Sequence, residues 1–164
     1  MHIRDAAEDD LPAIVEIYNA AIATRLATAQ LEPVSVPERL PWFYEHSADR
    51  HPLLVMEVAQ QIAGWLSFHP FTGRSAYRNT AEVSVYVHEE FRRRGLATAL
   101  LKDAITRSGA LELTALIGLI LGHNRGSLEL FERAGFERWG VLPRVVRLDG
   151  HAGDVVIVGR EVGA

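Results

Sequence analysis

The apolar positions of the chain follow two periods, and the shorter period predicts the strands. Side chains of a strand point to opposite faces in turn, so a half-buried strand alternates between apolar and polar residues, and a strand buried on both faces is a short apolar run. The segment AEVSVYV alternates strictly, with three valines on one face and Glu82, Ser84 and Tyr86 on the other. Strands are predicted at residues 2–6, 53–59, 62–69, 81–87, 113–121, 136–150 and 152–162.

The longer period, in which apolar residues recur three and four positions apart, predicts the helices. Asp9 and Asp10 are expected to cap the first helix, Ser35 and Pro37 to open the second, and Gly135 to end the last. The segments between these elements, among them a polar stretch before AEVSVYV, are predicted as loops. Helices are predicted at residues 11–23, 37–47, 95–105 and 124–134.

Length, composition and charge narrow the class of protein. A chain of 164 residues suits one domain, residues 1–164, with one substantial core. With 48% hydrophobic and 23% charged residues it has an ordinary globular composition. The net charge of −4 argues against non-specific binding to nucleic acid, and no window approaches the roughly 20 apolar residues of a membrane span. Neither nucleic acid nor a membrane is an expected partner.

The absence of cysteine excludes disulfides, thiolate catalysis and cysteine-ligated zinc. The histidines, including His69, His88 and His123, show no metal-ligand spacing, so no metal is predicted. The start of the chain, MHIRDAAEDD, is polar and acidic, unlike a secretory signal. The expected location is the cytoplasm.

The segment FRRRGLATALL, at residues 91–101, joins a predicted strand to a predicted helix. The first N–H groups of a helix have no internal partner and the helix dipole is positive there, so such a start binds phosphate. Gly95 allows close approach of the backbone, Ala97 keeps the next turn small, and three arginines add charge. The motifs GxxxxGK[ST] and GxGxxG are absent, which removes the main support for an ATPase or a dinucleotide oxidoreductase. The alternative is a solvated arginine turn that only caps a helix.

A second motif follows, Asn124-x-x-Ser127 and then FERAGF at residues 131–136. Together with the arginine turn after an alternating strand, it resembles the acetyl-CoA signature of GCN5-related N-acetyltransferases (GNAT). The segments FTGRSAYRNTAEVSVYV and EIYNAAI resemble phosphinothricin and methionine sulfoximine N-acetyltransferases within that superfamily. The resemblance spans nearly the whole chain and implies an α/β (α+β) fold, the GNAT fold, with a single mixed, mostly antiparallel sheet of about seven strands and about four flanking helices.

The resemblance implies acetyl-CoA as cosubstrate and assigns its contacts. Backbone groups of Val85, Tyr86 and Val87 are expected to hold the pantetheine arm like an added strand. Asn124 is expected to hydrogen-bond the pantetheine, with Ser127 and Phe131 nearby, and the alternative for Asn124 is a plain helix N-cap. The residues expected around the pyrophosphate are Arg92, Arg93, Arg94, Gly95, Leu96, Ala97 and Thr98.

The resemblance also assigns the acceptor side of the site. Glu82 matches a general base, which the chemistry needs because a protonated amine cannot attack a thioester, and its alternative is an exposed strand charge. Arg74 is expected to pair with a substrate carboxylate, and its alternative is a surface loop arginine. The expected substrate-binding residues are Thr72, Gly73, Arg74, Glu82, Val83 and Ser84.

Two positions depart from the family pattern. Phe131 occupies the place where many relatives carry a tyrosine that protonates the leaving thiolate, and phenylalanine cannot donate a proton. Ser127 or water remains to stabilise the thiolate. Near the C-terminus, His151-Ala152-Gly153-Asp154 replaces the expected tryptophan and histidine before an aspartate, so a different substrate pocket is predicted, with His151 in an exposed turn.

The leading interpretation is an N-acetyltransferase that acts on a small amine, an amino acid or analogue such as phosphinothricin or methionine sulfoximine. Without cysteine, the amine must attack acetyl-CoA directly in a ternary complex. The alternatives are a protein or peptide N-terminal acetyltransferase, and a non-catalytic acyl-CoA-binding module, which Glu82 speaks against. A homodimer is expected through the apolar C-terminal strands, with Trp139, Val145, Val146, Val156 and Ile157.

Overall fold

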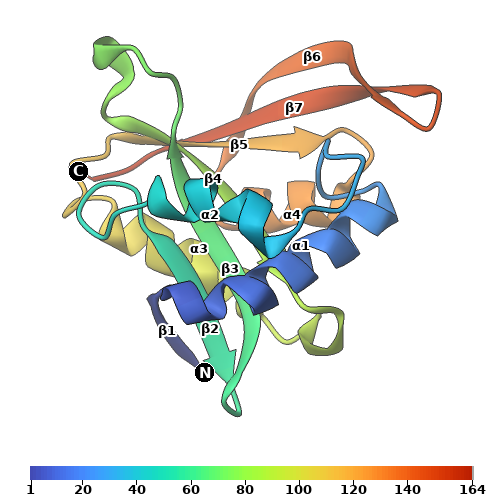
Figure 1. The fold of residues 1–164 in the computed structure, drawn as a ribbon. Helices are drawn as coiled ribbons and strands as arrows, with labels where there is room; N and C mark the ends of the chain where they lie inside the picture. Colours follow the sequence, from blue (N-terminus) through green and yellow to red (C-terminus); the bar gives the residue numbers. More distant parts are fainter. Residues whose placement is uncertain (164) are drawn as a thin grey trace.

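Seven strands form one sheet in the computed structural model, which describes residues 1–163 (Figure 1). The order across the sheet is β1-β2-β3-β4-β5-β7-β6, and only β4 and β5 pair in parallel. The predicted mixed, mostly antiparallel sheet is confirmed. The strands are β1 (His2–Asp5), β2 (Leu53–Val58), β3 (Gln61–Pro70), β4 (Thr80–Val87), β5 (Ala115–Leu121), β6 (Glu137–Leu148) and β7 (His151–Glu161).

Four α-helices cover the two faces of the sheet, with α1 and α2 in front and α3 behind in the view of Figure 1. They lie at the four predicted places: α1 (Leu11–Thr24), α2 (Val36–Tyr44), α3 (Leu96–Arg107) and α4 (Arg125–Arg133). Within residues 1–163, none of these helices has the length and apolar character needed to cross a membrane. The periodicity did not predict three short 3-10 turns, η1 (Glu8–Asp10), η2 (Ser75–Tyr77) and η3 (Glu89–Phe91).

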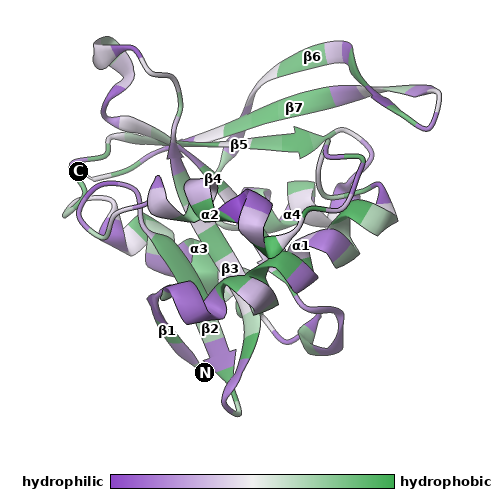
Figure 2. Cartoon of the chain, in the orientation of Figure 1, coloured by the Kyte–Doolittle hydropathy of each residue, from purple (hydrophilic) through white to green (hydrophobic). Residues whose placement is uncertain are grey.

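The core lies on both faces of the central strands. Leu53 and Val55 of β2 pack against the helix α1, whereas Leu54 and Met56 face the cluster that includes α3 and α4. A strand covered on both faces needs no polar side, which explains the continuous apolar run LLVM. Figure 2 shows the apolar colour along the central strands and the polar colour gathered on loops.

The predicted cap of the first helix is wrong in its detail. Asp10 precedes α1, but its side chain makes no cap hydrogen bond to that helix. Its carboxylate instead accepts the Ala7 N–H at 2.7 Å and pairs with Arg4 at 2.7 Å, and Arg4 also binds Glu57 at 2.6 Å. The aspartate therefore ties the N-terminal strand to η1 rather than capping α1, a tertiary contact that sequence periodicity does not reveal.

The start of α2 follows the sequence prediction. The Ser35 hydroxyl accepts the Glu38 N–H at 3.3 Å, and the Glu38 carboxylate accepts the Ser35 N–H at 3.3 Å, a reciprocal capping box. This cap fixes where the helix begins. It thereby sets Arg39 and Trp42, three residues apart and so neighbours on one helix face, toward the central sheet.

The two parallel strands pair over a short distance and then separate. Their ladder runs only from the pair Thr80 and Ala115 to the pair Glu82 and Ile117. Past this point the space between β4 and β5 is a groove, which extends to the start of α4. Glu82 therefore lies at the closed end of a wedge in the sheet.

Candidate active site

The edge of β4 that faces the wedge offers free backbone groups. The His88 N–H donates to the Ala63 carbonyl at 2.8 Å, and because hydrogen-bonded pairs alternate in an antiparallel ladder, the even-numbered residues of β4 bond to β3. The backbone of Val85 and Val87 therefore points into the wedge, where an extended ligand can add as a strand. Tyr86 pairs with Trp65 of β3, so its backbone groups bond to that strand, and its contact with the cosubstrate stays a prediction.

The arginine turn has the backbone shape of an anion site. Arg93, with φ of 61°, and Gly95, with φ of 79°, both lie in the left-handed region, an arrangement that can turn successive N–H groups toward one side. The helix α3 begins at Leu96 with no side-chain cap, so its first N–H groups have no partner within the helix. Arg92, Gly95, Leu96, Ala97 and Thr98 line the adjoining cleft with Arg93.

Arg94 departs from the predicted arrangement. Its guanidinium lies 5.3 Å from the centroid of the Phe91 ring, and it is not among the residues that line the cleft. The attraction between a guanidinium and a ring face holds this side chain beside Phe91. The side chains of Arg92 and Arg93 are thus the cations of the triplet that border the cleft, whereas Arg94 contributes only its backbone to the turn.

The second motif closes the open end of the wedge. The side-chain oxygen Oδ1 of Asn124 accepts the Ser127 N–H at 3.1 Å, which makes Asn124 the N-cap of α4, and the side-chain amide of Asn124 donates to the Ser127 hydroxyl at 3.0 Å. Because Ser127 accepts this bond, its own proton remains available to donate. Both residues line the groove, and the buried Phe131 ring lies at its floor, packed edge-on against Phe136 at 4.9 Å.

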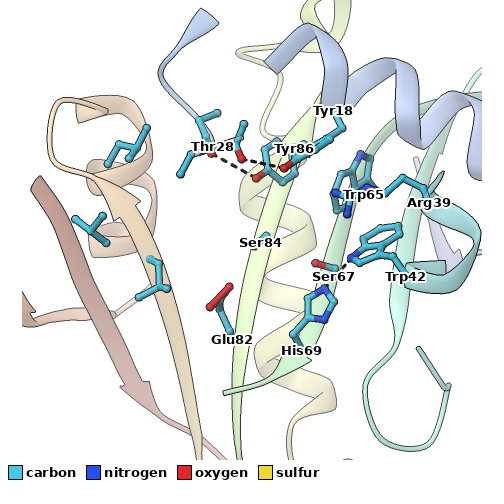
Figure 3. Close-up of a pocket in the computed structure, with 15 residues that line it drawn as sticks. Tyr18, Thr28, Arg39, Trp42, Trp65, Ser67, His69, Glu82, Ser84 and Tyr86 are labelled. Carbon is cyan, nitrogen blue, oxygen red and sulfur yellow. Dashed lines mark hydrogen bonds between the residues drawn. The ribbon is translucent and has the colours of Figure 1, made fainter. Parts of the chain in front are cut away.

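A second cleft, of about 310 Å³, opens over the face of β3 and β4 that carries Glu82 (Figure 3). Its volume suits a small molecule, since such sites hold roughly 300 to 1,000 Å³. The aromatic and polar lining comes from α1, α2, β3, β4 and the loop between the first two helices. These residues are Tyr18, Thr28, Arg39, Trp42, Trp65, Ser67, His69, Glu82, Ser84 and Tyr86.

Glu82 is half-buried in this cleft, and burial raises the pKa of its carboxyl. It pairs across the strands with His69, and Ser84 pairs with Ser67, so two cross-strand pairs place polar side chains on one face (Figure 3). The alternative of a freely exposed strand charge is thereby excluded. Val83 points the other way, is 2% exposed and packs in the core, so its side chain does not contact the cleft.

His69 is held in one protonation state. The Trp42 indole N–H donates to His69 Nε2 at 3.0 Å, which leaves the proton of a neutral ring on Nδ1. Burial first, and then the charges of His46, His51 and Arg39, lower the pKa of His69 to about 4. At neutral pH the ring is therefore an uncharged donor beside Glu82.

Arg39 lies between two aromatic rings at the α2 side of the cleft. Its guanidinium carbon is 4.6 Å from the ring centroid of Tyr18 and 4.6 Å from that of Trp42. Among residues 1–163, no carboxylate lies within ion-pair distance of Arg39. The cleft thus has a cation, Arg39, at one side and a half-buried carboxylate, Glu82, at the other.

The loop between α1 and α2 closes the cleft from above. The Tyr18 and Thr28 hydroxyls are 2.9 Å apart and hydrogen-bonded, and the Tyr86 hydroxyl donates to the Ala27 carbonyl at 3.4 Å. Burial raises the pKa of Tyr86, so the phenol stays protonated. Tyr86 lines this cleft and the groove between β4 and β5, which join at its side chain.

Three predicted substrate contacts lie away from the cleft. Thr72, Gly73 and Arg74 belong to the loop between β3 and β4, which projects at the upper left of Figure 1, and none of them lines the cleft. Their role as substrate contacts stays a prediction. His151 is exposed at the β6–β7 turn and also does not line it, in agreement with the predicted exposed position.

The sequence interpretation missed Arg39, Trp42 and His69 as site residues. The helix pattern did contain a signal, because Arg39 and Trp42 are spaced as neighbours on a helix face. His69 ends the strand IAGWLSFH as its first charged or ionisable residue, opposite the predicted base. Within residues 1–163, no three histidine or acidic side chains gather in a way that would hold a metal ion.

The fold and the site together define a class of protein. A wedge between two parallel strands, an anion-binding turn at its mouth and a carboxylate at its closed end are arranged for an extended phosphate-bearing cosubstrate and a small acceptor. Residues 14–136 match the model of the acetyltransferase (GNAT) family, and the chain belongs to that family.

Two curated relatives match most of the chain. The Bacillus subtilis (strain 168) protein named "Putative phosphinothricin acetyltransferase YwnH" is 44% identical over 163 residues, which cover 99% of each chain. An L-methionine sulfoximine/L-methionine sulfone acetyltransferase from Pseudomonas paraeruginosa is 35% identical over 144 residues, 87% of this chain and 84% of the relative.

Solved structures share the fold over nearly the full length. A phosphinothricin acetyltransferase from Sinorhizobium meliloti, determined in complex with acetyl-CoA, superposes with a TM-score of 0.93 at 29% identity and covers 99% of this chain and 88% of its own. A ribosomal-protein-alanine N-acetyltransferase from Brucella melitensis superposes with a TM-score of 0.94 at 32% identity, over 99% and 100% of the two chains.

Proposed function

We propose that this chain transfers the acetyl group of acetyl-CoA to the amine of an amino acid or amino-acid analogue, such as phosphinothricin or methionine sulfoximine. The observation that carries the proposal is the position of Glu82, a half-buried carboxylate in a small cleft at the closed end of the β4–β5 wedge. The names of the relatives supply the substrate class. The bound acetyl-CoA of the Sinorhizobium enzyme supports the cosubstrate.

The proposed reaction needs one base and one proton donor. The amine gives a proton to the Glu82 carboxylate, directly or through water, and its nitrogen attacks the thioester carbonyl carbon. The C–N bond forms, the C–S bond breaks, and the CoA thiolate leaves. Because burial raises the pKa of Glu82, its carboxylate is a stronger base than that of an exposed glutamate.

The leaving thiolate needs a partner other than Phe131. Ser127 is the proposed one, because its hydroxyl already accepts from Asn124 and so has its proton free to donate into the groove. Water in the groove is the alternative donor. Asn124 then acts as the N-cap that orients Ser127, in addition to lining the path of the pantetheine arm.

The main alternative acceptor is the N-terminus of a protein, as the name of the Brucella relative states for that enzyme. A cleft of about 310 Å³, closed from above by the α1–α2 loop, favours a small acceptor. A non-catalytic acyl-CoA-binding module would not need a buried carboxylate beside the wedge, which costs stability unless it serves a purpose.

The decisive experiment combines an acceptor panel with a change at Glu82. Release of free CoA is measured with phosphinothricin, methionine sulfoximine, standard amino acids, polyamines, aminoglycosides and peptides, and amino acids or their analogues are expected to react fastest. Glu82→Gln keeps the shape and removes the base, so turnover should fall by roughly 10² to 10⁴ while acetyl-CoA still binds. The loss should shrink as the pH rises toward the pKa of the amine.

Two results would contradict the proposal. Acetylation of peptides alone would remove the substrate class, and full activity of Glu82→Gln at neutral pH would make Glu82 a structural residue. Acetyl-CoA affinity, measured by calorimetry on both proteins, serves as the control for folding and cosubstrate binding.

We extend the proposal to assembly and location. A homodimer through the C-terminal strands is proposed because β6 exposes several large apolar side chains. A cytoplasmic location is proposed because a chain without cysteine has no need of an oxidising compartment. That nucleic acid and membranes are not partners remains a prediction from the net charge and composition.

A further inference from the structure

We infer that Arg39 binds the α-carboxylate of the acceptor and so selects amino acids over simple amines. The inference rests on the proposed function, because it specifies the acceptor of the same cleft. It replaces the exposed Arg74 with a residue that lines the cleft in this chain.

The stacking of Arg39 prepares the side chain for an anion. The rings of Tyr18 and Trp42 each lie 4.6 Å from the guanidinium carbon, so they can hold the guanidinium through its π faces. A guanidinium held in this way keeps the N–H donors in its own plane, where a carboxylate binds with two parallel hydrogen bonds. Stacking thus fixes the orientation of Arg39 without using its donors.

The cation has no anionic partner in the protein. Arginine side chains that serve structure are paired, as Arg4 is with Asp10 and Glu57. No carboxylate among residues 1–163 forms an ion pair with Arg39, although Glu82 lies in the same cleft. A half-buried cation with free donors in a small cleft is therefore set to pair with an anion that a ligand brings.

A second observation places an unmet polar group beside it. The Trp65 side chain is 1% exposed, lines the cleft, and its ring centroid is 5.5 Å from that of Trp42. Its indole N–H is buried and has no hydrogen-bond partner in the described chain. Buried donors are normally satisfied, so this one is an unmet polar group in the wall of the cleft, next to Trp42.

The two ends of the cleft match the two ends of an α-amino acid. Figure 3 shows Glu82 on β4 at one side of the cleft, with its carboxylate toward β5, and Arg39 and Trp42 of α2 at the opposite side, with His69 of β3 between them. The amine then lies toward Glu82 and the carboxylate toward Arg39. The neutral His69 adds no second positive charge that would compete with Arg39 for the carboxylate.

The test compares substrates with and without the carboxylate. The amino acid that the wild-type enzyme acetylates fastest is paired with its α-carboxamide, which keeps the amine and the side chain. For the amino acid, Arg39→Met should lower kcat/KM by about 10- to 100-fold, mainly through KM, the scale of a lost charge-assisted pair. For the carboxamide, the wild type should already be slow and Arg39→Met should change little.

Two further variants distinguish the effect of the Arg39 charge from that of its planar guanidinium and from a general effect of removing an arginine. Arg39→Lys keeps the charge but loses the planar fork, so its kcat/KM should lie between the other two. Arg50→Met, at an exposed arginine outside the cleft, is the matched control and should behave as wild type. Acetyl-CoA affinity and the unfolding temperature show whether each variant is folded.

The outcomes distinguish this inference from the function on which it rests. If the wild type acetylates no amino acid, the proposed function and this inference both fail. If it does, and Arg39→Met affects acid and carboxamide equally or not at all, only the inference fails. A carboxylate-specific loss in Arg74→Met instead of Arg39→Met would likewise overturn it.

Discussion

His69 shows how one buried side chain links the site to pH. Its Nε2 accepts from Trp42, the rings of His46 and His69 lie 4.7 Å apart, and Arg39 adds positive charge from the other side. All of these favour a neutral ring. Glu82 lies opposite His69 on β4, and its negative charge would favour a protonated ring. Burial has the larger effect, because the pKa of His69 is lowered to about 4.

A depressed histidine pKa predicts acid sensitivity. Below its ordinary value of 6.5 the unfolded chain binds a proton at His69, whereas the folded protein does not until about pH 4, so stability is lost as the pH falls through this window. In urea unfolding at several pH values, the wild type should therefore lose more free energy of unfolding between pH 6.5 and 4 than His69→Gln. Parallel curves for the two proteins would show that His69 titrates normally.

At the scale of single residues, the sequence predicted the parts of the site with local signals. Glu82 was predicted from the resemblance to phosphinothricin acetyltransferases and its place in an alternating strand, and Gly95 was predicted because it precedes an amphipathic run. Arg39 and His69 were not, because their roles depend on α2 and β3 meeting over one face of the sheet. Arg39 and His69 are 30 residues apart in the sequence, and only the packing of α2 on the sheet brings them into the same cleft.

Gly95, in the turn before α3, has a backbone conformation that most other residues rarely adopt. Gly95 has φ of 79°, and a side chain added there meets no atom within 4 Å, so substitution is limited by backbone conformation and by charge rather than by space. Asparagine and aspartate tolerate the left-handed region about equally. They differ in the charge placed at the positive end of the helix, beside the proposed phosphates.

This pair of substitutions tests the anion site. Gly95→Asp should weaken acetyl-CoA binding by on the order of 10²-fold or more, because its carboxylate repels the pyrophosphate and competes for the free N–H groups. Gly95→Asn should lose less than about tenfold, the cost of backbone strain alone. Calorimetric titration with acetyl-CoA gives both values, and equal affinities in the two variants would argue against a phosphate at this turn.

Elements were predicted well where the pattern is long, and their ends less well. The strands and helices lie where periodicity put them, since burial on a sheet or helix face imposes that periodicity. The role of Asp10 was mistaken because Arg4, six residues earlier, takes its carboxylate. The sequence interpretation did not foresee that the Tyr86 backbone bonds to β3. Strand register depends on both strands of a pair, so it cannot be read from the sequence of one strand alone.

The whole molecule exposes an apolar surface at one edge of the sheet. β6 is the edge strand, and Figure 2 shows apolar colour along β5, β7 and β6. Of the predicted interface residues, Val156 is 3% exposed and packs in the core, so it does not contribute. The most exposed large apolar side chains of this edge are Leu119, Trp139, Val141, Leu142 and Val145, each between 42% and 54% exposed.

A second copy of the chain is the proposed cover for this surface. Light scattering should give twice the 18.2 kDa of one chain, and Val145→Asp should return the mass to that of a monomer. Val145 is 54% exposed, so the fold should survive. Thr106→Asp, at an exposed position on α3, is the control that adds the same charge elsewhere. A monomeric wild type at micromolar concentration contradicts the proposal.

The short ladder between β4 and β5 divides the sheet mechanically. In the described sheet, the ladder between the half made of β1 to β4 and the half made of β5, β7 and β6 has three residue pairs, from Thr80 and Ala115 to Glu82 and Ile117, and the two halves also share one core cluster. Any rotation of one half against the other pivots on this joint, and displacement grows with distance from a pivot. A rotation of this kind would move the arginine turn, at the mouth of the wedge, more than Glu82, which lies at the joint itself.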